Sequence, residues 1–367
     1  MDIESFPLYD IEGDARQCGQ QYGRAAGERI DLSLRTYRAA FERVGLSWER
    51  TRALARRFMP VVEAFDAGML REIEGVAEGA GVPPEDIVAL NARSEMLYAF
   101  QQLEATEPPD GCTGVVVMPS ASANGRLIHA QNWDWRVESL ELGVVLRIQP
   151  AKGPAMLTFA EAGTLARAGL NSVGIAVTGN FIKADSDGRQ QGMPLALIRR
   201  GILQSELYAK ALGVVCRTAR SISNNMIVTH AEGEAVSLET CPDQVFWQQP
   251  EGGILVHANH FKTPAALARV VDRSLETTPD SLYRDRRVTE ALHLQRQRAG
   301  GLAEQDVLDA LQDRFGAPRA VCRSPSAGPG GASSATVATI VMDPAARKMR
   351  IAPAPFKPAH RFTEYSL

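Results

Sequence analysis

Cys112 is the residue with the clearest chemical potential, in the stretch PPDGCTGVVV at residues 108–117. It follows an acidic, proline-rich segment and opens a run of β-branched residues, which predicts a strand that begins near the cysteine. Three interpretations are open. The thiol is a small buried hydrophobe, the commonest role of a free cysteine, or it is activated by a histidine, with His129 and His257 as candidates. In the third, the Gly111–Cys112 bond is cut, and the new α-amine, with a pKa of about 8, is the base for its own thiol.

The third interpretation needs an acceptor that orients the amine and donors that hold a tetrahedral oxyanion. Three later stretches read as strands that end in Asn or Asp beside aromatic residues: QNWDWR at 131–136, GLNSVGIAVTGNF at 169–181 and VHANHF at 256–261. Neighbouring strands would bring such residues close to a cysteine at a strand start. These stretches therefore hold the candidate partners of Cys112.

Trp133 and Trp135 alternate with Asn132 and Asp134 in the first of these stretches. On a strand, the two indoles would share one face and the two polar side chains the other. We expect at least one indole to pack in the core and the other to line an acyl pocket, because small-molecule sites have mostly apolar walls.

A metal site is not expected. His257 and His260 are three residues apart on an expected strand end, without a nearby Glu or Cys that would complete a ligand set. The five cysteines are widely spaced, which favours neither a disulfide framework nor a zinc site.

The predicted secondary structure changes from helices to strands near residue 106. Residues 14–45, 49–80 and 84–104 carry apolar positions at helical spacing, with a kink expected at Pro60 and a helix end at Gly81. The segment TEPPDG breaks this pattern, and short β-rich runs follow. Later segments are predicted as helical (191–220 and 279–314), as strands (223–257, TVATIVMD and KMRIAP) and as a surface loop (324–335).

Composition excludes several classes of protein. The chain has 367 residues, 45% of them hydrophobic, which is enough for a large core. The 40 basic and 43 acidic residues are mixed along the chain, so neither nucleic acid nor a membrane surface is an expected partner. The first residues lack a basic region followed by an apolar run, and no segment approaches a membrane span, so we expect a cytoplasmic protein.

The order of several blocks resembles a known family. DGCTGVVV, followed some twenty residues later by GRLIHAQNWDW, is similar to the acyl-coenzyme A:6-aminopenicillanate acyltransferase family of the N-terminal-nucleophile hydrolase superfamily, which also holds penicillin V acylases and bile salt hydrolases. REIEGVAEGAGVPPEDIVALNARSEM resembles the helical pro-segment of that family. GLNSVGIAVTGNF, GEAVSLET, HANHF and CRSP resemble its later blocks.

The resemblance implies an α+β fold, a four-layer α-β-β-α sandwich of two antiparallel sheets preceded by a helical pro-segment. Residues 1–111 would become a light chain and residues 112–367 the catalytic heavy chain. The two chains would stay associated in one compact unit, because the helices of the first third have apolar faces to bury. The sequence is also compatible with a homo-oligomer.

The resemblance also implies roles for individual residues. Cys112 would attack the Gly111 carbonyl to cut the chain and would then be the nucleophile of the mature enzyme. Asp134 would hold the α-amino group, Asn259 would donate to the oxyanion, and Asn180 would line the same site. Turn capping for Asp134 and local backbone bonding for the asparagines are the alternative roles.

An arginine near the nucleophile would favour the thiolate, and Arg323 in VCRSP is its expected counterpart. Bile salt hydrolases carry this arginine within an SSASR-type strand, whereas GASSATVATI has Thr336 at that position. They also have an arginine before their NFD motif, where this chain has Gln131. The first departure leaves open which arginine serves the site, and the second makes bile salts poorer candidates as substrates.

The function implied is acyl transfer through a thioester on Cys112, with hydrolysis of a small acyl amide as the first expectation. No cofactor is needed for this reaction. The alternative is an N-acyltransferase that takes acyl-coenzyme A as co-substrate and an amine as acceptor. The alternative from another class is an uncleaved, non-catalytic binding or scaffold protein.

Overall fold

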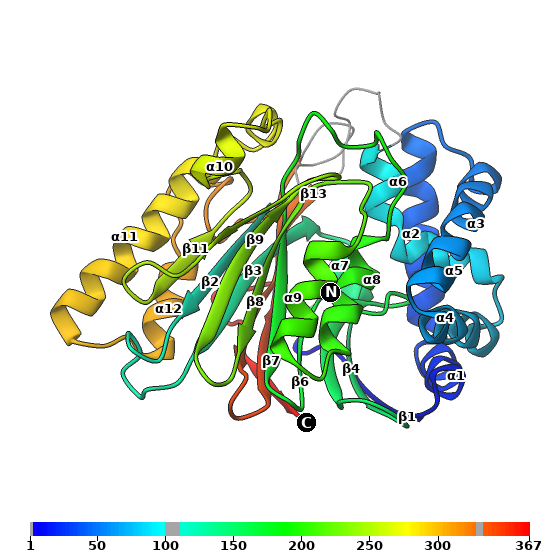
Figure 1. The fold of residues 1–367 in the computed structure, drawn as a ribbon, viewed down its shortest axis with the longest axis horizontal. Helices are drawn as coiled ribbons and strands as arrows, with labels where there is room; N and C mark the ends of the chain where they lie inside the picture. The colour runs from blue at the N-terminus through cyan, green and yellow to red at the C-terminus, as the bar shows by residue number, and fades with distance from the viewer. Residues whose placement is uncertain (1–2, 100–110, 328–332) are drawn as a thin grey trace.

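The computed structural model describes residues 3–99, 111–327 and 333–367 (Figure 1). The predicted break at 106–110 and the last residues of the expected helix 84–104 lie outside these ranges. The helices are α1 (Ala15–Ala25), α2 (Gly27–Arg43), α3 (Trp48–Phe65), α4 (Ala67–Ala80), α5 (Pro84–Asn91), α6 (Arg93–Ala99), α7 (Ser139–Leu142), α8 (Leu195–Leu203), α9 (Tyr208–Arg217), α10 (Pro264–Leu267), the 3₁₀ helix η1 (Ser274–Glu276), α11 (Ser281–Ala299) and α12 (Glu304–Leu311).

The strands form two sheets. They are β1 (Leu8–Gly13), β2 (Gly111–Val117), β3 (Ile128–Arg136), β4 (Gly143–Pro150), β5 (Met156–Glu161), β6 (Ala168–Asn171), β7 (Ile175–Phe181), β8 (Asn224–His230), β9 (Glu234–Thr240), β10 (Val245–Gln248), β11 (Ile254–His257), β12 (Ser326–Ala327), β13 (Ser333–Asp343), β14 (Lys348–Pro353) and β15 (Thr363–Ser366). One sheet has the order β1-β4-β5-β6-β7-β8-β9-β10. The other has the order β11-β2-β3-β13-β14-β15, and β12 pairs with β13.

Four layers result, as predicted. The helices of the first third, with α8 and α9, bury their apolar residues against the first sheet. A second apolar cluster fills the space between the two sheets, and a third packs α11 and α12 against β2, β3 and β11 of the second sheet. In Figure 1, α11 and α12 lie at one side of the paired sheets and α1 to α6 at the other. The predicted α-β-β-α sandwich is therefore confirmed.

The first third is helical as predicted, with one difference. Gly81 ends α4 in the left-handed conformation, with φ of 68°, and Pro60 lies inside α3. However, residues 8–13, for which no strand was predicted, form β1 and pair in parallel with β4. The first third thus contributes an edge strand to a sheet whose other strands follow Cys112.

Helices α1 and α4 are in contact backbone to backbone. Gly19 and Gly23 of α1 face Gly75 and Gly79 of α4, four residues apart in each helix. A Cβ atom at Gly19 would lie 2.1 Å from the carbonyl oxygen of Glu72, and one at Gly75 would lie 2.4 Å from that of Arg16. Only residues without a side chain allow this approach.

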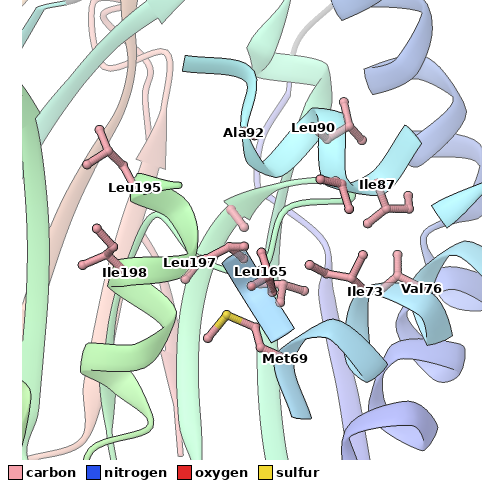
Figure 2. Packing of buried hydrophobic residues seen from close by; sticks show 14 of the residues in the cluster. Met69, Ile73, Val76, Ile87, Leu90, Ala92, Leu165, Leu195, Leu197 and Ile198 are labelled. Carbon is pink, nitrogen blue, oxygen red and sulfur yellow. The ribbon is translucent and has the colours of Figure 1, made fainter. Parts of the chain in front are cut away.

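The apolar core joins segments from both sides of Cys112. Figure 2 shows Met69, Ile73 and Val76 of α4 packed near Leu165 and Leu197, which come from the later part of the chain. The predicted surface loop at 324–335 is partly strand, since Ser326 and Ala327 pair with Ser334 and Ser333. Among the described helices, none has the length and apolar character needed to cross a bilayer.

Candidate active site

Cys112 is the second residue of β2, a strand that is buried along its whole length between β11 and β3. Cys112 lies opposite Trp133, and Gly111 opposite Asp134. Directly opposed residues of an antiparallel pair share a face of the sheet. The sulfur therefore faces the apolar layer between the sheets, where both Trp133 and Trp135 pack. Gly111 and Asp134 face the helices of the outer layer.

The sulfur lies beside a buried guanidinium. Arg167, in the loop before β6, points Nη2 at Cys112 Sγ over 3.4 Å. Its guanidinium carbon is 4.2 Å from the centre of the Trp133 ring, and that ring packs edge-on against Phe159 with centroids 5.4 Å apart. A fixed cation beside a thiol favours the thiolate. The Trp133 ring therefore positions the Arg167 guanidinium beside the sulfur. Trp135 has a different contact, since its Nε1 donates to Tyr37 Oη over 3.0 Å.

The main chain of Cys112 is held by two other side chains. Its N–H donates to Asn259 Oδ1 over 2.8 Å, and its carbonyl oxygen accepts from Arg284 Nη1 over 2.8 Å. Arg284 Nη2 also donates to Asn259 Oδ1 over 2.8 Å. The amide of the Gly111–Cys112 bond is thus engaged by an asparagine that an arginine holds in place.

Asp134 and Arg323 lie against the residue that precedes the cysteine. A Cβ atom at Gly111 would be 2.7 Å from Asp134 Oδ2 and 2.6 Å from the guanidinium carbon of Arg323. Asp134 Oδ1 accepts from Thr336 Oγ1 over 2.6 Å, and Oδ2 lies 3.0 Å from Arg323 Nε. Thr336, at the position where an arginine was considered, is thus a partner of the Asp134 carboxylate. Burial raises the pKa of Asp134, and the charges of Arg323 and Arg284 oppose that rise.

Asp280, directly before α11, joins the two arginines of this network. Its Oδ2 accepts from Arg284 Nε over 2.8 Å and from Arg323 Nη2 over 2.5 Å. All three side chains are almost completely buried. Buried charges are stable when each has an opposite partner and satisfied hydrogen bonds, so Asp280 fixes both cations beside the Gly111–Cys112 bond.

Asn180, on β7 of the facing sheet, lies against β2 on the sulfur's side. A Cβ atom at Gly114 would be 3.4 Å from Asn180 Nδ2. Asn180 donates to the His257 carbonyl over 2.6 Å and accepts from Gln131 Nε2 over 2.6 Å. Asn259 Nδ2 donates to the Phe181 carbonyl over 2.7 Å. A carboxamide has two N–H groups, so among the described residues Asn180 and Asn259 each have one N–H group that is not used in these bonds.

The two histidines considered as bases have other partners. His129 lies between the hydroxyls of Thr229 and Thr178, at 3.0 and 2.9 Å, and burial lowers its pKa to about 3. His257 is bonded through Nε2 to Glu239 over 2.9 Å and through Nδ1 to the Ala258 carbonyl over 3.0 Å. Each ring nitrogen is therefore engaged by a group other than the thiol, which favours the interpretation that needs no histidine.

The structure thus brings Cys112, Asp134, Asn259 and Arg323 together around one peptide bond, with Asn180 on a strand of the facing sheet. Sequence reasoning missed Arg167, Arg284 and Asp280. The spacing of Asp280 and Arg284, four residues apart at the start of a helix, indicated an ion pair but not its place. No pattern in the sequence around Arg167, TLARAGLN, indicated that this residue belongs to the site.

Three comparisons describe the relatives of this chain. The model of the family "acyl-coenzyme A:6-aminopenicillanic acid acyl-transferase" matches residues 120–357. The acyl-coenzyme A:6-aminopenicillanic-acid-acyltransferase 40 kDa form of Emericella nidulans is 27% identical over 349 residues, which are 93% of this chain and 90% of that protein. Two solved structures are also similar. A mutant conjugated bile acid hydrolase from Clostridium perfringens is 11% identical, with 70% of this chain and 92% of that chain covered and a TM-score of 0.49. Penicillin V acylase from Agrobacterium tumefaciens is 15% identical, with coverages of 68% and 85% and a TM-score of 0.44.

Proposed function

This chain belongs to the acyl-coenzyme A:6-aminopenicillanic acid acyltransferase family, and from that premise we propose that it is a self-cleaving amidohydrolase that acts through a thioester on Cys112. The observation that carries the proposal is the set of contacts around the Gly111–Cys112 bond. Asp134, Asn259 and Arg323, far apart in the sequence, all contact this bond or the residue before it. A binding or scaffold protein would have no need for such a set of buried charges.

The first step is cleavage of the chain itself. The Cys112 thiol attacks the Gly111 carbonyl carbon, the C–N bond breaks, and the Gly111 acyl group moves to sulfur while the nitrogen takes up a proton as the new α-amine. Water then hydrolyses this thioester, leaving a Gly111 carboxylate and a free thiol. Asn259 Oδ1, which accepts from the Cys112 N–H in the intact chain, keeps the nitrogen in place.

The mature enzyme repeats this chemistry on a substrate. The α-amine of Cys112 accepts the proton of its own thiol, and the thiolate attacks the substrate carbonyl. Asp134 orients the ammonium group, and the remaining N–H groups of Asn259 and Asn180 donate to the oxyanion. The amine leaves with the proton, and water releases the acyl group from sulfur. Arg167, beside Sγ, stabilises the thiolate at both stages.

The two chains are expected to remain associated after cleavage. Strand β1 pairs with β4 across the cut, and the core residues in Figure 2 come from both sides of it. Separation would expose this apolar surface to water. We also expect a cytoplasmic location.

An acyl-coenzyme A-dependent N-acyltransferase is the second candidate function. It is supported by the relative from Emericella nidulans, whose name describes such an activity. In this reaction an acyl-coenzyme A thioester acylates Cys112, coenzyme A leaves as its thiol, and an amine takes the place of water. The thioester on Cys112 is common to both functions.

The experiment that tests the proposal is intact mass spectrometry under denaturing conditions, with N-terminal sequencing, on wild type and Cys112→Ala. We expect two wild-type chains, the larger beginning Cys-Thr-Gly-Val, and one full-length chain for the variant. Mature protein is then incubated with acyl amides and with acyl-coenzyme A thioesters, with and without amines. A wild-type chain that stays uncut for days would overturn self-cleavage, and an N-acylated amine formed only from the thioester would identify the transferase.

A further inference from the structure

Asn259, the proposed oxyanion donor, lies in the loop that follows β11 and not on a strand. The last pair of β11 with β2 is His257 with Gly114, so the N–H of Asn259 lies beyond the sheet. This N–H donates instead to Ser281 Oγ over 2.6 Å. Ser281, the first residue of α11, is completely buried. A buried N–H without an acceptor would be costly, so this hydroxyl fixes the main chain of the loop at Asn259.

The Ser281 hydroxyl does not serve its own helix. A serine at the start of a helix ordinarily caps that helix or bonds to nearby main chain. Among the described residues, the partners of this Oγ are instead the nitrogen of Asn259 and, at 2.7 Å, Nδ1 of His260. These residues are 22 and 21 positions away in the sequence. The hydroxyl therefore links α11 to the loop that carries the asparagine.

His260 determines the direction of this hydroxyl. Since Oγ accepts the proton of the Asn259 N–H, its own proton is directed at His260 Nδ1, which must then be the acceptor. Burial lowers the pKa of His260 to about 4, so near neutral pH the ring is uncharged and a proton on Nε2 leaves Nδ1 free to accept. The ring also stacks on that of His257, with centroids 6.3 Å apart and planes at 25°. The imidazole is thus a fixed acceptor for the Ser281 O–H group.

The same turn of α11 holds the side chain of Asn259. Arg284, three residues after Ser281 and so on the same side of the helix, donates from Nη2 to Asn259 Oδ1 over 2.8 Å. Asn259 Nδ2 donates to the Phe181 carbonyl of β7 over 2.7 Å. The main chain, the carboxamide oxygen and one N–H of Asn259 are therefore all held. The carboxamide has one orientation as a result, and its second N–H has a fixed direction.

We propose that Ser281 and His260 are positioning residues of the reaction: the imidazole orients the Ser281 hydroxyl, and the hydroxyl fixes Asn259 so that its second N–H points at the oxyanion. This inference rests on the proposed function and identifies residues that serve its site. Both residues act through Asn259 and not by contact with the substrate. An oxyanion donor is effective only at about 2.7–3.1 Å from the oxyanion, and loss of one donor costs about 100- to 1,000-fold in kcat.

The test measures steady-state kinetics of the mature protein with acetyl-, butyryl- and octanoyl-p-nitroanilide, and uses the one that wild type hydrolyses fastest. Ser281→Ala leaves the Asn259 N–H without its acceptor, so the loop shifts and the donor is misplaced. We expect kcat to fall by about 10- to 100-fold and KM to stay within about twofold of wild type, because the oxyanion exists only after attack on the carbonyl. An unchanged kcat, or a rise in KM alone, would overturn the proposal.

Substitutions of His260 test the second link. His260→Asn places an amide oxygen close to the position of Nδ1, so the Ser281 hydroxyl keeps an acceptor, whereas His260→Leu removes it. We expect His260→Asn to stay within about threefold of the wild-type kcat and His260→Leu to lose about tenfold, the equivalent of one hydrogen bond. Equal kcat values for the two variants would refute the role of His260. This pair also decides the proposal if Ser281→Ala does not fold.

Ser205→Ala is the matched control. Ser205 is also buried, but its hydroxyl donates to the Gly201 carbonyl of the preceding helix, α8, over 3.0 Å. This variant should keep the wild-type kcat and KM. A loss of kcat in Ser205→Ala as large as that in Ser281→Ala would overturn the proposal, because the loss would then follow from removal of any buried serine hydroxyl.

Self-cleavage reports on the same contacts, because Asn259 Oδ1 accepts from the Cys112 N–H in the intact chain. If wild type hydrolyses none of the three anilides, the rate of self-cleavage, measured by intact mass spectrometry, replaces kcat, and Ser281→Ala should slow it by about tenfold or more. A reaction of Ser281→Ala at the wild-type rate would refute this inference and leave the proposed function intact. A wild-type chain that neither cuts itself nor hydrolyses an anilide would refute both.

Discussion

Each polar atom of Cys112 has a different partner. The sulfur faces Arg167, the nitrogen donates to Asn259, and the carbonyl oxygen accepts from Arg284. The sulfur lies in the layer between the sheets, whereas Asp134 and Arg323 lie on the opposite face, against Gly111. Charged side chains therefore lie near the Gly111–Cys112 bond on both faces of the sheet, with Arg167 on one face and Asp134 and Arg323 on the other.

Gly111→Ala should block self-cleavage. The added methyl group would come within 2.7 Å of both Asp134 Oδ2 and the Arg323 guanidinium, so these side chains or the strand must move. Small displacements of reacting groups cost about 100-fold in rate. Intact mass spectrometry over time measures the rate of cleavage.

Gly27→Ala is the control for this substitution, since among the described residues a Cβ atom at Gly27 meets no atom within 4 Å apart from those of its chain neighbours and its own helix backbone. It should be cleaved at the wild-type rate. Cleavage of Gly111→Ala at that same rate would refute the role given to the contacts at Gly111.

The sequence predicted the candidate site only in part. Asp134, Asn259 and Arg323 were predicted because the blocks that contain them resemble blocks of the acyltransferase family. Arg167 was not found, because it approaches the sulfur only when the two sheets stack, and a single arginine before a strand carries no periodic signal. The same holds for Asp280 and Arg284, whose helix was predicted but whose partners include Arg323 and the Cys112 carbonyl, far away in the sequence.

At the scale of elements, helices α1 and α4 are in close contact. The four glycines let the two helices approach until the backbone of one meets that of the other. Such close packing increases dispersion contacts between the two helices. The helical periodicity of these segments was visible in the sequence, but this pairing was not predicted.

Gly75→Ala should destabilise the protein by about 1–3 kcal/mol, the usual cost of an extra carbon in a packed contact. The new Cβ would lie 2.4 Å from the Arg16 carbonyl, which belongs to backbone and cannot rotate away. Chemical denaturation of the Cys112→Ala background, with and without Gly75→Ala, measures the difference. Alanine raises intrinsic helix stability by up to about 1 kcal/mol over glycine, so a net gain in stability would contradict the close contact.

The predicted ends of helices and strands agree with the structure where the local sequence signal is strong. Gly81 ends a helix with the left-handed conformation expected of it. Strand β1 was missed because its pairing with β4 is parallel and joins residues far apart, so nothing local in LYDIEG specifies it. Likewise, β15 depends on β14 for its pairing.

At the scale of the whole molecule, His129 links the two sheets. It is on β3 and bonds to threonines of β7 and β8 in the facing sheet. Burial lowers its pKa from 6.5 to about 3. Below pH 6.5 the unfolded chain therefore binds a proton that the folded chain does not, so the stability that depends on neutral His129 is lost as pH falls from 6.5 towards 3.

We expect this effect to cost about 2 kcal/mol between pH 7 and pH 5. The measurement compares the free energy of unfolding of the Cys112→Ala chain with that of the same chain carrying His129→Gln, at both pH values. Other titrating groups, such as Glu95 and Asp187, are present in both chains and cancel in the difference. A difference between the two chains that does not change with pH would contradict a neutral, buried His129.

Strand β1 comes from the first third of the chain but belongs to the larger sheet, and this affects how the protein can be produced. Before cleavage, β1 and β4 are parts of one chain, so their pairing during folding is a first-order process. After a cut at Gly111–Cys112, the same pairing would require two molecules to meet, so recovery from denaturation would depend on concentration. The uncut chain would then be the form that acquires the structure, and the mature enzyme would retain it mainly through the slowness of its unfolding. Recombinant production would accordingly succeed from the single full-length gene and fail when the two fragments are supplied separately at low concentration.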